Sequence, residues 1–136
     1  MKIEEQWLMW EPLSQLRGDY YFELIALDAH DANFKIILEK YNNKKEKVHL
    51  TFKFGVACYR VMDELYAFEM QKNFLREGSS FYKVINSKYI QWLSDISKGV
   101  SYAIQPNMQH FVIFTEDFTL EILNTADPEI EMINAP

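Results

Sequence analysis

The fold is decided by FYKVINSKYIQWLSDIS at residues 81–97 and HFVIFTEDFTLEILNTADPEI at residues 110–130. In these two segments, runs with the composition of β-strands enclose one stretch with helical periodicity. A strand is predicted at FYKVI, and a hairpin is predicted where HFVIFT and FTLEIL flank Glu116 and Asp117. PEIEMI is predicted to add a short edge strand with its charges turned outward. The pattern indicates an α+β protein.

The best-defined element is a helix predicted at 87–98. Asn86 or Ser87 can cap its free N–H groups, and Gly99 lies where a left-handed residue ends many helices. Lys88 and Lys98 are predicted on the solvent side. The apolar stripe of this helix follows i, i+4 and i+7 spacing and consists of Tyr89, Leu93 and Ile96, with Trp92 one position away.

Residues 19–54 predict a meander of three strands, at 19–28, 33–41 and 47–54. The third strand alternates most clearly, which is typical of an antiparallel sheet with one face in water. Its predicted buried side chains are Val48, Leu50, Phe52 and Phe54. A short helix or an extended strap is expected over residues 1–18. Within residues 55–80, GVACYRV could continue a strand, and ELYAFEMQKNFLRE has helical propensity, although a strand pair is also possible there. We therefore predict one α+β domain over 1–136, a mostly antiparallel, curved sheet (meander) with one main amphipathic helix packed on one face.

The composition indicates a folded, non-membrane protein. The chain has 136 residues, of which 49% are hydrophobic and 15% aromatic, so its length and composition suffice for a core. It has no apolar run of about 18 residues and no signal-like N-terminus. Cys58 is the single cysteine, which excludes an internal disulfide and agrees with a reducing compartment. We expect a cytoplasmic protein without a membrane segment.

The charge of −6 is unevenly distributed. Residues 1–34 carry a net −5, residues 35–98 a net +5, and residues 99–136 a net −6 without a single Lys or Arg. Nucleic-acid binding requires a concentrated basic surface, so this balance disfavours it. Acidic segments favour a basic partner through electrostatic steering. The alternative is a solvated surface that keeps the protein soluble.

Histidine and cysteine provide the first candidates for catalysis. His49, His110 and Cys58 could serve as base and nucleophile, but Cys58 lies in an apolar, strand-like context where cysteine behaves as a small hydrophobe. Adjacent carboxylates, such as Glu116 with Asp117, do not by themselves give the spacing of a glycosidase pair. No catalytic constellation is recognised, so we expect the protein not to be an enzyme.

Two polar loops are candidate binding sites. DAHDAN at 28–33 lacks the ligand spacing of a calcium loop and reads as a hairpin turn. A basic cluster around Tyr41 could contact RNA, but Glu39 and Glu46 dilute it, and the preferred interpretation is a charged, solvated hairpin tip. The cluster consists of Lys40, Lys44, Lys45 and Lys47. The four glycines form no phosphate-binding loop, so we expect no metal and no cofactor.

Residues 81–128 resemble small uncharacterised bacterial proteins, some associated with toxin–immunity loci. The resemblance rests on Asn-Ser-x-Tyr-x-x-Trp at 86–92 and His-Phe-x-Ile-x-Thr at 110–115, and it covers about the last third of the chain. It implies a protein that acts by occupying a partner's surface, often the basic surface of a nuclease. It implies no catalytic residues.

The leading hypothesis is therefore binding of a basic protein partner, immunity- or antitoxin-like, through an acidic surface. The residues expected to form that surface are Glu116, Asp117, Glu121, Asp127, Glu129 and Glu131. A curved sheet lined with aromatic residues that holds a small apolar molecule is the main alternative. A homodimer built on an exposed strand edge is the third.

Overall fold

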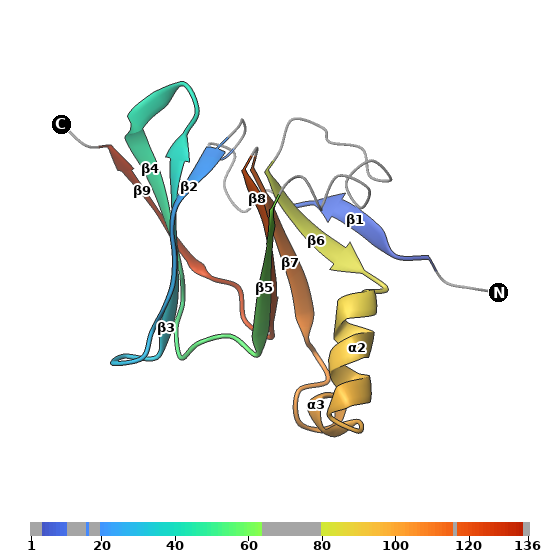
Figure 1. Cartoon of the computed structure of the whole chain (residues 1–136). Helices are drawn as coiled ribbons and strands as arrows, with labels where there is room; N and C mark the ends of the chain where they lie inside the picture. Colours follow the sequence, from blue (N-terminus) through green and yellow to red (C-terminus); the bar gives the residue numbers. More distant parts are fainter. Residues whose placement is uncertain (1–3, 11–15, 17–19, 64–79, 116, 135–136) are drawn as a thin grey trace.

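The computed structural model describes residues 4–10, 16, 20–63, 80–115 and 117–134, apart from the side chain of residue 102. Its strands form two antiparallel sheets that face each other (Figure 1). Sheet A has the order β1 (Gln6–Met9), β6 (Phe81–Ile85), β7 (Gln109–Phe114), β8 (Phe118–Asn124) and β5 (Cys58–Asp63). Sheet B has the order β2 (Tyr20–Asp28), β3 (Asn33–Lys40), β4 (Asn43–Phe52) and β9 (Glu129–Asn134). Helices α2 (Lys88–Ile96) and α3 (Val100–Ile104) follow β6.

The predicted fold class is confirmed, with the strands divided between two sheets. Strands β2, β3 and β4 form the predicted meander, and β7 pairs with β8 as the predicted hairpin. The chain then returns to sheet B, where β9 pairs with β4 and forms one edge, as PEIEMI predicted. The lead-in contributes an extended strand, β1, at the opposite edge of sheet A from β5.

The main core lies between the two sheets. Phe52 of β4 meets Phe111 of β7 with ring centroids 5.4 Å apart, and Phe34 of β3 meets Tyr59 of β5 at 4.6 Å. Every second residue of β3 and β4 is buried because alternate side chains of a strand point to one face. Burial of these aromatic and branched side chains is the main stabilising contribution of the fold.

The outer face of sheet A is also buried, which explains why β6, β7 and β8 read as nearly continuous apolar runs. Trp7 packs against Phe114 at 5.3 Å and against Tyr82 at 6.1 Å on this face. Val112 lies in the same cluster and is fully buried. Strand register places three polar residues here as well, Arg60, His110 and Glu121.

The predicted helix is confirmed with Ser87 as its N-cap, since Ser87 Oγ accepts the N–H of Ile90 at 3.0 Å. Its C-terminus differs in detail from the prediction. Lys98, with φ of 54°, is the first left-handed residue, and its N–H donates to Asp95 O. Gly99, with φ of 81°, follows and donates to Ser94 O. These two bonds complete a Schellman motif.

The C-terminal half of the helix stripe points to solvent, contrary to expectation. Tyr89 is buried, but Ile96 is 58% exposed and Trp92 is 47% exposed. The reason is the position of α2, which contacts the outer face of sheet A through its first turn and extends beyond the ends of β6 and β7 (Figure 1). Phe54 is a second correction. The strand ends at Phe52, and Phe54 adopts φ of 65° and is 89% exposed.

Within residues 55–80 the structure describes one strand, β5, so Cys58–Asp63 is extended. The rest of that ambiguous stretch, 64–79, lies outside the described residues, as does Pro12 of the lead-in. Among the residues described, no helix is both long enough and apolar enough to cross a membrane.

Replacing Lys98 with Gly is expected to raise the free energy of unfolding by roughly 0.5–1 kcal/mol, because glycine adopts the left-handed conformation without the steric cost of a Cβ. Lys98 is exposed to solvent. Thermal unfolding followed by circular dichroism measures the change. The matched control, Lys88→Gly in the first helical turn, is expected to destabilise by a similar amount. A loss of stability in Lys98→Gly would contradict the assignment of Lys98 to the left-handed conformation.

Candidate functional site

The acidic residues that the sequence predicts as one partner surface differ in exposure and in position. Glu121 is 1% exposed, so its expected position on the surface is wrong. Asp117, Glu131, Asp127 and Glu129 are exposed, the last two in ion pairs with Lys83 at 3.2 Å and Lys53 at 3.0 Å. Glu116 lies outside the described residues.

The exposed acids do not form one patch. Asp117 precedes β8 and Asp127 follows it, so the seven residues of that strand separate them. At about 3.4 Å per residue this is a distance of roughly 20 Å or more. Glu129 and Glu131 lie on β9, at the edge of the other sheet. Their closeness in the sequence therefore does not place all of these acids in one contact area.

Glu121 is the centre of a buried polar network. Its carboxylate accepts hydrogen bonds from Arg60 Nε at 2.5 Å and Nη2 at 3.0 Å, and its Oε1 lies 2.9 Å from His110 Nε2. Burial of the carboxyl group alone would raise its pKa, but the hydrogen bonds from His110 and Arg60 and the charge of Arg60 outweigh burial and lower the pKa. Glu121 is therefore ionised at neutral pH.

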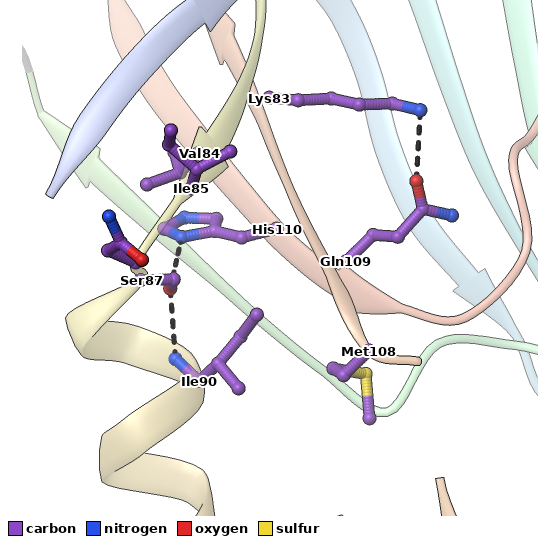
Figure 2. Close-up of a pocket in the computed structure, with 9 residues that line it drawn as sticks. Lys83, Val84, Ile85, Ser87, Ile90, Met108, Gln109 and His110 are labelled. Carbon is purple, nitrogen blue, oxygen red and sulfur yellow. Dashed lines mark hydrogen bonds between the residues drawn. The ribbon is translucent and has the colours of Figure 1, made fainter. Parts of the chain in front are cut away.

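His110 connects this carboxylate to the helix N-terminus. Because ionised Glu121 accepts a hydrogen bond, Nε2 of a neutral His110 carries the proton and Nδ1 has the lone pair. Ser87 Oγ lies 2.7 Å from Nδ1 and donates to it, while also accepting the N–H of Ile90 (Figure 2). The hydrogen bonds thus run in one direction, from Ser87 through His110 to Glu121.

Tyr89 covers the other side of the network. Its ring lies 5.4 Å from the His110 ring and under the Arg60 guanidinium at 4.0 Å. Its hydroxyl is 2.8 Å from Cys58 Sγ, and burial together with this bond raises the tyrosine pKa. In register, Leu123 separates Cys58 from His110, so these two residues do not form the nucleophile–base pair considered from the sequence.

A pocket of about 350 Å³ opens where β6 ends and β7 and α2 begin (Figure 2). Ser87 and His110 lie on one side of it, and Lys83 and Gln109, whose side chains are bonded at 2.9 Å, lie on the other (Figure 2). Its apolar lining consists of Val84, Ile85, Ile90 and Met108. An apolar lining with a few convergent polar groups is the usual composition of a small-molecule site, and this volume is at the lower end of the usual range.

Sequence reasoning missed this network because its members were considered separately. Ser87 was expected only as a helix cap, and Glu121 as surface charge. One signal was present in TLEIL, where a lone acid interrupts an apolar strand. A charge at such a position is rarely buried unless it is paired. The partners could not be found from sequence because Arg60 and Glu121 are 61 residues apart.

The two polar loops are hairpin turns in the structure. Asp28 and Asp31 accept the N–H groups of His30 and Asn33, and both carboxylates bind Lys35. The described residues contain no group of three or more metal-ligating side chains. At the other turn, the lysines of the basic cluster are partly neutralised, since Lys40 pairs with Glu46 and Lys47 with Glu23 and Glu39.

Comparison with known proteins gives no match to a family, to a curated protein or to a solved structure.

Proposed function

We propose that this protein acts by binding a protein partner through the end of the molecule formed by α2 and α3. Four large apolar side chains in this helical end are exposed: Trp92 (47%), Ile96 (58%), Val100 (53%) and Ile104 (72%). Trp92 and Ile96 are four residues apart on α2, as are Val100 and Ile104 on α3, so each pair shares one side of its helix. Clustered apolar exposure is typical of interaction sites.

The open face of sheet B supports this choice by contrast. Several of its outward charged side chains are paired with one another, Lys35 with Asp28, Lys47 with Glu23, and Lys53 with Glu129, although Leu24 is also 40% exposed on this face. A face of exposed ion pairs is well hydrated and gains little from contact with a partner. The helical end has exposed tryptophan instead, the residue most enriched among interface hot spots.

The partner that fits is a protein of net positive charge with an apolar contact surface. The chain carries a net charge of −6, with no Lys or Arg after Lys98, whereas the helical end itself exposes Lys88 and Lys98 as well as Asp95, so the acidic charge belongs to the molecule as a whole. Acidic charge would accelerate association, while the apolar contacts would provide affinity. Neutralisation of a toxin by steric occlusion, the immunity- or antitoxin-like role implied by the resemblance, is the concrete form of this proposal.

The interior of the molecule favours a protein partner over a ligand held between the sheets. The side chains that meet there, including Phe34, Phe52, Phe111 and Ile122, are at most 2% exposed and pack against one another. This core is filled by aromatic rings in contact. A cupped sheet that encloses a small molecule would need that volume to be empty.

The double variant Trp92→Ser/Ile96→Ser is expected to weaken partner binding about thirtyfold or more, because truncation of a central tryptophan removes about 2 kcal/mol or more. The measurement is a pulldown from the native host, followed by titration of the recovered partner by calorimetry at low and high salt. Both residues are exposed, so folding should be preserved.

The matched control is Glu129→Lys/Glu131→Lys on β9. Reversal of these charges, outside the helical end, is expected to slow association and reduce its salt dependence while leaving dissociation nearly unchanged. If the helical variant binds as tightly as the wild type, the proposed surface is wrong. If the charge reversal alone abolishes binding, the partner uses the edge of sheet B.

A further inference from the structure

The pocket beside α2 has a feature that protein binding does not require: a serine, a histidine and a carboxylate joined in sequence. Ser87 Oγ lies 2.7 Å from His110 Nδ1, and His110 Nε2 lies 2.9 Å from Glu121 Oε1. These are the distances and order of a nucleophile, a general base and the group that orients the base. Such a constellation is recognised by geometry and roles, whatever the fold or chain order.

The direction of the hydrogen bonds suits nucleophilic catalysis. Glu121 is ionised and is fixed by two bonds from Arg60. It therefore holds the His110 tautomer that leaves Nδ1 free to accept a proton from Ser87. Glu121 and Arg60 are positioning residues in this arrangement, since buried Glu121 bonds the imidazole and Arg60 acts through Glu121, whereas Ser87 is half-buried in the pocket wall.

We propose that Ser87 is the nucleophile of an acyl-transfer site that cleaves carboxylic esters with a small acyl group. The pocket of about 350 Å³ has room for such an acyl group against its apolar lining. Ile90 lies next to Ser87, and Met108 lies on the side of the pocket below Gln109 (Figure 2). Burial of an apolar acyl group there provides binding energy.

The reaction is balanced by the residues present and water. Ser87 Oγ forms a bond to the ester carbonyl carbon as its proton moves to His110 Nδ1. The bond from that carbon to the alcohol oxygen then breaks, and His110 returns the proton to the departing alcohol. Water, deprotonated by His110, attacks the acyl–Ser87 ester, which releases the acid and restores Ser87 O–H.

The test is covalent labelling of the full chain with an ethyl fluorophosphonate probe, followed by intact mass and peptide mapping. The expected result is one adduct, on Ser87, with slow hydrolysis of p-nitrophenyl acetate by the unlabelled protein. His110→Gln is expected to reduce the labelling rate on the order of a hundredfold or more. Ser101→Ala, which changes another half-buried helical serine, should label like the wild type.

Ser87→Asn is the variant that separates chemistry from folding. Asn caps helices as well as Ser, and its amide can donate to His110, but it offers no nucleophile. We expect Ser87→Asn to keep the circular dichroism spectrum and to lose both the adduct and the esterase activity. An unlabelled wild-type protein, an adduct on another residue, or unchanged labelling in His110→Gln would each overturn the proposal. Partner binding by the helical end is measured separately and does not depend on the outcome.

Discussion

Replacing Phe111 with Ala is expected to lower the free energy of unfolding by about 4 kcal/mol, the largest effect of any single truncation considered. Phe111 is 1% exposed and lies on β7 between the two sheets, with its ring 5.4 Å from Phe52 and 5.1 Å from Trp10. Truncation of a fully buried Phe removes apolar contacts and leaves a cavity that rigid sheets cannot close. Because domains of this size are stable by about 5–15 kcal/mol, much of the stability should be lost.

Urea unfolding of Phe111→Ala and of a matched variant, Phe54→Ala, measures this effect. Phe54 is 89% exposed, so its truncation is expected to change stability by less than about 0.5 kcal/mol. Equal effects of the two variants would contradict the packing of sheet A on sheet B. Equal effects would also support the sequence-based expectation that Phe54 continues the series of buried side chains on β4.

The variant Glu121→Ala is expected to destabilise the protein by about 3 kcal/mol. It removes the acceptor of two Arg60 bonds and one His110 bond in a buried site, and groups left unpaired in such a site carry their full desolvation cost. Arg60 is 43% exposed and can be hydrated after the substitution. The expected loss of stability is therefore at the lower end of the range for a broken buried ion pair. Glu131→Ala, at an exposed position, is the control and should be nearly neutral.

The pH dependence of the same residue provides a second measurement. The pKa of Glu121 is lowered in the folded protein from its ordinary value of 4.5. The stabilisation from its charge is therefore fully present above that value and is lost as pH falls through the folded pKa. The stability difference between the wild type and Glu121→Gln should be constant from pH 7 to about 5 and should narrow below about 4. A difference that widens towards acid would mean that Glu121 is protonated when folded.

Local patterns in the sequence predicted the elements of the fold well. Alternation identified β3 and β4, and the Asn-Ser pair before an amphipathic stretch identified the start of α2 at Ser87. The pattern could not predict which residues at the end of each element are buried by neighbouring elements. Ile96 continues the apolar stripe of α2 but lies beyond the sheet, and Phe54 continues the alternation of β4 but follows the end of the strand. Burial of such residues depends on tertiary neighbours, which periodicity does not specify.

The candidate sites were predicted less well, for a related reason. Acidic residues near the C-terminus suggested one surface, but Glu121 is buried and Asp117 and Asp127 lie at opposite ends of β8. The polar network depends on register between strands distant in sequence, which pairs Arg60 with Glu121 and Glu121 with Val112, beside His110. A single sequence contains no direct record of that register, whereas it does contain the local signal for a helix cap.

The most direct test of the proposed function is hydrogen–deuterium exchange of the wild-type protein with and without the partner recovered from its host. The expected result is slower exchange of the backbone amides of α2 and α3 on binding, with little change in β2, β3 and β4. Protection confined to sheet B, with α2 and α3 exchanging as in the free protein, would contradict binding through the helical end.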